Sequence, residues 1–278
     1  MPIKVFEWNI NQATNVKGSN EIPSFVVDEI LKMDKDIFIL TEFAWTKNAD
    51  DVLSALSGVY DYRATEYRKY NQNEVLIGWR KDRFSLVSDD KIDASNDNPD
   101  LLSVDLNDNE SGKTLTVVGC RIKVVEPYSR RCSQFETIVD FTNAENVLVG
   151  GDFNCLREDY KGQDWGLGVM KRIAESKGYE LHTPNGNESS IYQKNNYIVF
   201  KEDHFLTRGI KCNDVSYSRE FTKQNPDIYL HGEDFSVYNL NVRATTWSIP
   251  FGSGIPDHAM VVGEFKIGEE IYDDIGQD

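Results

Sequence analysis

The sequence predicts an α+β fold in which two mixed β-sheets pack face to face and helices cover their outer faces. Short segments rich in β-branched and aromatic residues recur along the chain and outnumber the helical segments. Some of these strand candidates follow one another as hairpin arms would, and others are separated by a helix. Since no repeat, low-complexity tract or linker interrupts the chain, we expect one domain over residues 1–278.

The expected strands are short apolar runs bounded by charged or turn-forming residues. In chain order they cover residues 3–8, 36–41, 74–80, 101–106, 114–121, 146–150, 203–207, 210–215 and 259–265. Clusters of Asn and Asp at residues 89–99 and 185–190 predict surface loops.

Three segments space their apolar residues by three and four, which is typical of a helix with one buried face. These apolar positions are Ile22, Val26, Ile30 and Met33, then Cys132, Phe135, Ile138 and Val139, then Leu167, Met170, Ile173 and Ala174. We expect Ser129 to cap the start of the second helix. Gly178 is placed to end the third helix.

The composition is that of a globular protein with a large core, since 40% of the 278 residues are hydrophobic. No apolar run approaches the roughly 20 residues that cross a bilayer. The first residues run directly into a strand-like segment without a signal-peptide pattern. The four cysteines form no C-x-x-C pair, so we expect them to be reduced. We therefore expect a cytoplasmic monomer.

The net charge of −16 bears on the partners of the protein. A protein that grips nucleic acid mainly by neutralising phosphates should be basic, because counterion release drives that binding. The charge therefore argues against tight nonspecific DNA binding, without excluding nuclease activity. An acidic pocket suits a hard divalent cation.

Polar residues follow four of the expected apolar strands or precede them directly, at positions where side chains of one sheet edge can converge. These positions are Asn9 and Asn11, Glu42, Asp152 and Asn154, and Asp257 with His258. A carboxylate at a strand end can bind Mg²⁺, which takes a few oxygen ligands and keeps water. Asp152 and Asn154 are two residues apart, so they point to the same side of an extended chain.

Each of these residues also has an ordinary structural interpretation. Asn9 or Asn11 could cap a turn, and Glu42 could be a solvated charge at a strand end. The Asp152–x–Asn154 spacing is common in turns, and a lone histidine such as His258 is usually structural. The four positions in this order make the functional interpretation the better one.

In this order the motifs resemble those of the endonuclease/exonuclease/phosphatase superfamily, which includes deoxyribonuclease I, exonuclease III-like nucleases, inositol polyphosphate 5-phosphatases and bacterial sphingomyelinases. Residues 7–11 resemble its first-strand W-N motif, and residues 36–42 its D-I-(apolar)-Q-E motif, with Thr41 in place of Gln. Residues 151–154 match its G-D-F-N motif, and residues 256–258 its closing S-D-H motif, with Pro256 in place of Ser. Residues 202–206 resemble the strand that supplies the aspartate partner of the histidine, although Glu202 stands where an apolar residue is usual.

The resemblance implies a four-layer α/β/β/α sandwich of the deoxyribonuclease I-like type and a Mg²⁺ or Mn²⁺ cofactor. By position, Glu42, Asn9 and Asp257 would belong to the metal site, with Asn9 also close to the phosphate. Asp152 would orient or deprotonate the attacking water, and Asn154 would hold a phosphate oxygen. His258 would stabilise the pentacovalent phosphate, oriented by Asp203.

The chain departs from the family where His or Tyr often follows the central strand, because it has Arg121 there. A guanidinium fork matches phosphate oxygens, so Arg121 could clamp phosphate, although it could also be a surface arginine. Arg130 and Arg131 open the second expected helix, where a phosphate group could bind. A solvated helix start is the alternative. We expect His182, His204 and His231 to be structural.

These features together predict a divalent-metal-dependent phosphoesterase that hydrolyses a phosphodiester by water attack. Nucleic acid is the expected substrate, which makes the enzyme a nuclease. The alternatives are a phosphatase or phosphodiesterase for a small or lipid phosphate, and a catalytically silent binding module on the same fold. Loops around residues 67–70 and 246–254 could hide a feature that selects an inositol phosphate or a membrane.

Overall fold

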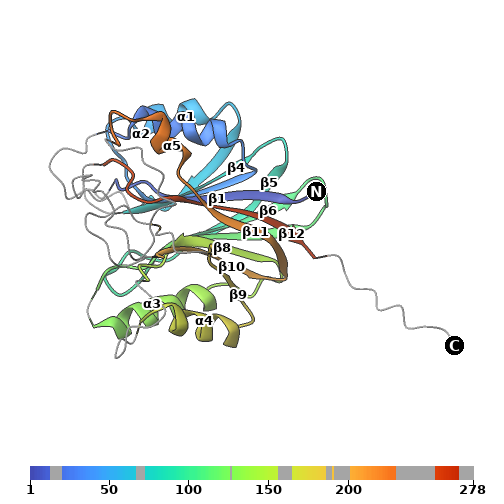
Figure 1. Ribbon diagram of the computed structural model, residues 1–278. Helices are drawn as coiled ribbons and strands as arrows, with labels where there is room; N and C mark the ends of the chain where they lie inside the picture. Colours follow the sequence, from blue (N-terminus) through green and yellow to red (C-terminus); the bar gives the residue numbers. More distant parts are fainter. Residues whose placement is uncertain are drawn as a thin grey trace.

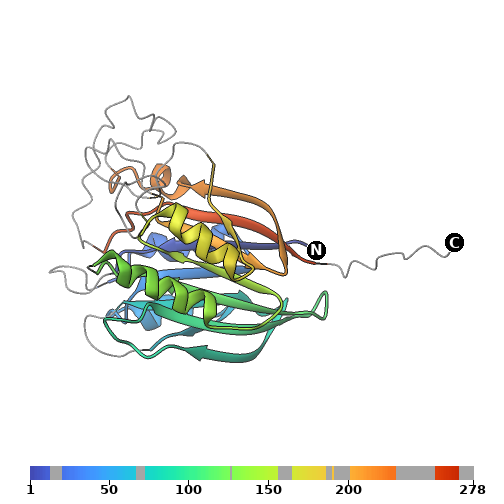
Figure 2. The ribbon, with the colours of Figure 1, turned by 90° about the horizontal axis from the view of Figure 1, so that it is seen from below.

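Two six-stranded sheets pack face to face in the computed structural model, with helices on their outer faces (Figures 1 and 2). The structure describes residues 1–12, 21–66, 73–125, 127–155, 165–185, 190, 201–229 and 254–268. The four-layer α/β/β/α arrangement expected from the sequence is thereby confirmed. Residues 67–70 and His231, and most of residues 185–190 and 246–254, lie outside the described residues.

The first sheet has the strand order β11-β12-β1-β2-β4-β3. Its strands are β1 (Ile3–Asn9), β2 (Ile37–Phe43), β3 (Tyr60–Ala64), β4 (Glu74–Arg80), β11 (Ile210–Ser218) and β12 (Met260–Ile267). Only the central pair β1 and β2 is parallel, and the other neighbours in this sheet are antiparallel.

The second sheet has the order β5-β6-β7-β8-β10-β9. Its strands are β5 (Phe84–Lys91), β6 (Asp100–Asp108), β7 (Thr114–Arg121), β8 (Val147–Asp152), β9 (Glu180–His182) and β10 (Asp203–Arg208). Here β7 and β8 form the parallel pair. Each sheet therefore has one parallel pair near its centre.

The helices are α1 (Ser24–Met33), α2 (Ala49–Leu56), α3 (Tyr128–Asp140), α4 (Leu167–Ser176) and α5 (Glu220–Gln224). Figure 1 places α1, α2 and α5 beside the first sheet, and α3 and α4 beside the second. Three apolar layers result, one between the sheets and one beneath each set of helices. Among the residues that the structure describes, no helix is long and apolar enough to cross a membrane.

The nine expected strands and three expected helices are all present, with ends shifted by a few residues. Gly178 follows α4 with φ +76°, a conformation that glycine adopts without strain, as expected of a helix-ending residue. The expected cap at Ser129 is wrong, because α3 begins at Tyr128 and Pro127 occupies the capping position. The loop expected from residue 89 is also wrong at its start, since β5 continues to Lys91.

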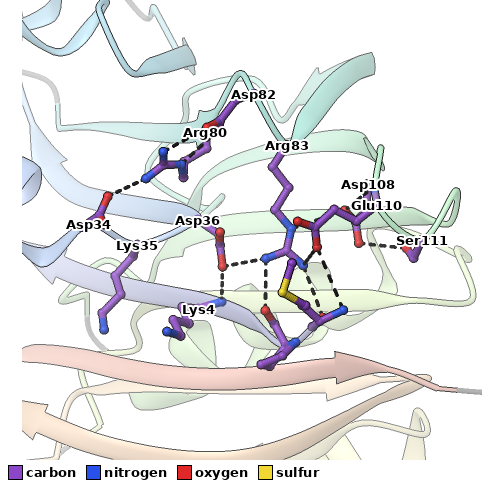
Figure 3. A network of polar contacts seen from close by, with 12 residues as sticks. Lys4, Asp34, Lys35, Asp36, Arg80, Asp82, Arg83, Asp108, Glu110 and Ser111 are labelled. Carbon is purple, nitrogen blue, oxygen red and sulfur yellow. Dashed lines mark hydrogen bonds and ion pairs between the residues drawn. The ribbon is translucent and has the colours of Figure 1, made fainter.

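Arg83 joins the two sheets at the edge where β1 and β2 begin (Figure 3). Its guanidinium lies 2.9 Å from Asp36, which precedes β2, and 3.3 Å from Asp108, the last residue of β6. It also donates to the carbonyl oxygens of Met1 and Pro2. The Arg83 side chain is only 8% exposed, so these carboxylates depend on it for charge balance.

Replacing Arg83 by Met should lower the free energy of unfolding by about 3–5 kcal/mol, because it leaves buried carboxylates without their cation. Arg80→Met is the matched control. Arg80 pairs with Asp34 and Asp82, whose side chains are 70% and 67% exposed, so its loss should cost less than about 1 kcal/mol. Urea denaturation of both variants measures the difference. Equal losses of stability in the two variants would contradict the role of Arg83 as a buried junction between the sheets.

Candidate active site

The expected site residues lie at one edge of the two packed sheets, because strand direction brings them there. Asn9, Arg121 and Asp152 end β1, β7 and β8, which are members of the two parallel pairs, and Glu42 lies near the end of β2. Asp203 begins β10, which runs antiparallel to β8, and pairs with Asp152 in register. The amino end of one strand and the carboxyl end of its neighbour thus share this edge.

A β-bulge directs Glu42 toward the site. The pairing of β2 with β4 shifts by one residue between Leu40 and Phe43, and Glu42 has φ +50°. Regular alternation would turn Glu42 toward the helices, where Leu40 and Phe43 pack. The extra residue lets Phe43 reach that apolar layer and frees Glu42 to turn toward the opposite sheet, a use of bulges common beside active sites.

Two side chains of the site also close turns in their own motifs. Asn9 Oδ1 accepts the backbone N–H of Asn11 at 2.9 Å, and Asp152 Oδ1 accepts that of Asn154 at 2.8 Å. Asn11 and Asn154 have φ +51° and +47°, a left-handed conformation that asparagine tolerates. The turn-capping interpretation is therefore correct for Asn9 and Asp152, and it also fixes where their remaining polar atoms point.

Asp152 lies at the centre of the polar contacts. Its Oδ2 accepts hydrogen bonds from Asn9 Nδ2 at 3.0 Å and from Asn154 Nδ2 at 3.2 Å. Asn154 Nδ2 also donates to the carbonyl oxygen of Ile122, so both of its protons are engaged. Burial and the charge of Asp203 raise the pKa of Asp152 to about 7, against the opposing charges of His258 and Arg121. A carboxyl group with such a pKa suits proton transfer near neutral pH.

His258 and Asp203 form a buried pair across the two sheets. His258 Nδ1 lies 2.8 Å from Asp203 Oδ2, and the carbonyl oxygen of His258 accepts the indole N–H of Trp8 at 3.0 Å. Burial alone would lower the pKa of His258, but the charge and hydrogen bond of Asp203 outweigh it and raise the pKa well above its ordinary value. The pairing with Asp203 therefore favours the cationic imidazolium. The other ring nitrogen, Nε2, lies 3.9 Å from Asp257 Oδ1, which is too far for a hydrogen bond.

Arg121 extends from β7 toward the first sheet and contacts three carboxylates. Its Nη2 lies 2.7 Å from Glu42 Oε1, its Nε 3.6 Å from Asp152 Oδ2, and its Nη1 3.6 Å from Asp100 Oδ2. Its side chain is 13% exposed, so the interpretation as a surface arginine is wrong. Burial alone would lower the pKa of Arg121, but these carboxylates outweigh it and keep the guanidinium charged.

Glu42, Asn9 and Asp257 provide oxygen donors that suit a hard divalent cation. Burial, opposed by the charge of His258 and assisted by that of Glu42, raises the pKa of Asp257 to about 6. No three His, Cys, Asp or Glu side chains in the described part of the chain are grouped to hold a metal ion by themselves. Mg²⁺ usually binds one or two carboxylates together with waters and substrate phosphate, so this sparse donor set fits it.

The two other arginines of the expected phosphate site have protein partners. Arg130 forms an ion pair with exposed Asp97. Arg131 is buried, packs over Tyr128 and donates to the carbonyl oxygen of Asn154 at 3.3 Å. Arg131 therefore lies behind the G-D-F-N turn and supports its backbone.

Two of the histidines expected to be structural are bonded within the protein. His204 lies between the carbonyl oxygen of Lys201 and the hydroxyl of Thr183, and burial lowers its pKa to about 3. His182 lies 2.7 Å from the hydroxyl of Thr207.

Solved structures share the fold of this protein over nearly the whole chain. An endonuclease/exonuclease/phosphatase family protein from Bacteroides thetaiotaomicron superposes with a TM-score of 0.64 at 15% identity, covering 97% of this chain and 99% of that one. The chain has the endonuclease/exonuclease/phosphatase fold. D. rerio TDP2 complexed with a single-strand DNA product gives a TM-score of 0.63 at 11% identity, covering 95% and 99%. A mannosyl-6-phosphatase from B. thetaiotaomicron gives 0.62 at 13% identity, covering 95% and 99%.

No protein-family model and no curated protein sequence matches the chain. At these identities the structural likeness establishes the endonuclease/exonuclease/phosphatase fold and leaves the substrate open. The resemblance seen in the sequence motifs is confirmed at the level of the fold.

Sequence reasoning missed two buried carboxyl groups of this fold's polar edge. Glu7 lies on β1 beneath the site, where its Oε1 accepts the hydroxyl of Thr41 at 2.9 Å, and burial raises its pKa well above the ordinary value. Val5, Glu7 and Asn9 are spaced by two along β1 and so share one face, and this spacing was the available signal for Glu7. Asp100 pairs with Arg121 in the register of β6 and β7, which only the paired strands reveal.

The buried dyad predicts how His258 titrates in metal-free protein. NMR should show His258 still cationic at pH 7, whereas His182 and His204 should be neutral because burial lowers their pKa values. Since its folded pKa is raised, the stabilisation from His258 is present below its unfolded pKa and is lost as pH rises through the folded value.

Asp203→Asn should bring the pKa of His258 down, because the carboxylate charge is removed while the shape is kept. The His258→Ala variant assigns the resonance. A neutral His258 at pH 7 in the wild type, or a pKa that Asp203→Asn leaves unchanged, would contradict the pairing.

Proposed function

We propose that the protein is a divalent-metal-dependent phosphoesterase that hydrolyses a phosphodiester by attack of water. The observation that carries the proposal is the convergence, at one edge of both sheets, of a carboxylate that could bind a metal, a buried carboxyl group of raised pKa and a histidine whose pairing with Asp203 favours its cationic form. Glu42, Asp152 and His258 supply these groups from three different strand ends. A binding module would have no need of all three in one place.

Asp152 is proposed to take the proton of the attacking water. Asn9 and Asn154 fix its Oδ2 by hydrogen bonds, so its carboxyl plane is set before substrate arrives. The expected contact of Asn154 with a phosphate oxygen would replace one of its present bonds, to Ile122 or to Asp152. Asn154 therefore acts first as a positioning residue for Asp152.

His258 is proposed to stabilise the negative charge that develops on the phosphate. Asp203 holds its Nδ1, which fixes the direction of the ring and leaves Nε2 for a phosphate oxygen. Arg121 is the second cation at this edge and can bind two phosphate oxygens at once. Mg²⁺ or Mn²⁺, bound by Glu42 with Asn9 and Asp257, would neutralise charge on the phosphate.

Nucleic acid is the first substrate class that we propose. One neighbour of known structure, D. rerio TDP2, is complexed with a single-strand DNA product. This makes a nuclease the first activity to test.

A small phosphate ester is the second candidate, and a specific observation favours it. The cations flanking the site are matched by acids, since Lys123 Nζ lies 3.0 Å from Asp100 and Arg130 pairs with Asp97. A net charge of −16 also disfavours a long polyanion. One neighbour, the mannosyl-6-phosphatase, is named for such a substrate.

A hydrolysis screen tests the proposal. The protein is incubated with Mg²⁺ or Mn²⁺ and plasmid DNA, single-strand DNA, an abasic duplex, RNA, phosphoinositide or sugar phosphates. At least one substrate should be cleaved, EDTA should stop the reaction, and added metal should restore it. Asp152→Asn should reduce turnover by roughly a hundredfold or more, the usual contribution of a positioned base.

His182→Gln is the matched control, because it changes a buried histidine that lies outside the site. It should retain wild-type turnover. Wild-type turnover in Asp152→Asn would place the reaction elsewhere, and no cleavage of any substrate would contradict the proposed activity.

A further inference from the structure

The guanidinium of Arg121 has one short bond and two longer contacts. The distance of 2.7 Å between Nη2 and Glu42 Oε1 is that of a charged hydrogen bond. The contacts of 3.6 Å to Asp152 and Asp100 are too long to be hydrogen bonds. Glu42 is therefore the residue that holds Arg121 in its present position.

Arg121 also has an unused donor that faces the acidic centre. Within the described part of the chain, Arg121 Nε is buried without a hydrogen-bond partner, as is Asp100 Oδ2. Buried donors are normally paired, so an unpaired one calls for a ligand or another explanation. Asp100 has a second cationic partner besides Arg121, because Lys123 Nζ lies 3.0 Å from Asp100 Oδ1.

The bond to Glu42 conflicts with the metal-binding role proposed for that residue. A guanidinium and a divalent cation are both positive, and both would use the carboxylate of Glu42, so each opposes binding of the other. A phosphate group resolves the conflict. Its oxygens match the guanidinium fork, including the unpaired Nε–H, and it brings further oxygen ligands for the cation.

We propose that Arg121 holds Glu42 until a phosphate group draws the guanidinium away, so that phosphate and the divalent cation bind this centre cooperatively. The inference rests on the proposed phosphoesterase function and adds the order in which the ligands bind. The free protein binds the cation weakly, and substrate completes the centre. Because coupling between two ligands is reciprocal, the cation strengthens phosphate binding by the same factor.

Calorimetric titration with Mg²⁺, with and without inorganic phosphate, tests the coupling without any catalytic assay. In the wild type, saturating phosphate should raise Mg²⁺ affinity by about tenfold, within the usual range for coupled sites. Arg121→Gln frees Glu42, so it should bind Mg²⁺ about tenfold more tightly than the wild type in phosphate-free buffer. Phosphate should then add little.

Lys123→Gln is the matched control, because it removes a neighbouring cation that contacts Asp100 and not Glu42. It should leave phosphate-free Mg²⁺ affinity within about twofold of the wild type. A gain as large as that of Arg121→Gln would mean that general charge, and not competition for Glu42, is responsible, and it would overturn the inference. Unchanged or weaker Mg²⁺ binding in Arg121→Gln would also overturn it.

The same titrations separate this inference from the proposed function. If Glu42→Ala abolishes Mg²⁺ binding but Arg121→Gln does not improve it, the metal site stands and the competition is refuted. If neither the wild type nor Arg121→Gln binds Mg²⁺ with phosphate present, the proposed function fails, and the inference fails with it.

Circular dichroism shows whether Arg121→Gln is folded. Should it not fold, Arg121→Lys keeps the buried positive charge on a shorter side chain that withdraws from Glu42. This variant should bind Mg²⁺ more tightly than the wild type in phosphate-free buffer, and equal or weaker binding would refute the competition.

Discussion

The contact of Arg121 with Glu42 is the interaction on which the polar edge of this fold depends. It joins β7 of one sheet to β2 of the other, and it places a cation among carboxylates that would otherwise repel one another. Two unit charges 4 Å apart interact with about 4 kcal/mol at the effective dielectric constant of a protein. Repulsion of that size is comparable to the whole stability of a domain. A cation at this position therefore reduces the repulsion among these acids.

Several residues at this edge also have strained backbone conformations. In the described residues, five positions other than glycine have positive φ, and Asn11, Glu42 and Asn154 belong to the site. Such conformations cost of order 1 kcal/mol or more each, and they persist where surrounding bonds determine them. Here the hydrogen bonds of Asn9, Asp152 and the bulge in β2 determine them. The strained residues at this edge are thus explained by the directions in which their side chains must point.

The sequence predicted the regular strands and the convergence of motifs well, because apolar alternation and strand ends are local signals. Short elements such as α2, β3 and β9 carry too little periodicity to stand out. The cap at Ser129 was wrong because Pro127 fixes the chain direction two residues earlier. The pairing of Arg121 with Glu42, and the nearness of Asp100, depend on which strands become neighbours, and no local pattern encodes that.

A crystal structure of the protein soaked with Mn²⁺ and phosphate would locate both ligands, because the anomalous signal of manganese identifies the metal directly. We expect a manganese peak on the carboxylate of Glu42, with phosphate between His258 and Arg121. The guanidinium of Arg121 should have left Glu42 in that structure. A manganese site elsewhere, or Arg121 still bound to Glu42 beside an occupied phosphate site, would contradict this expectation.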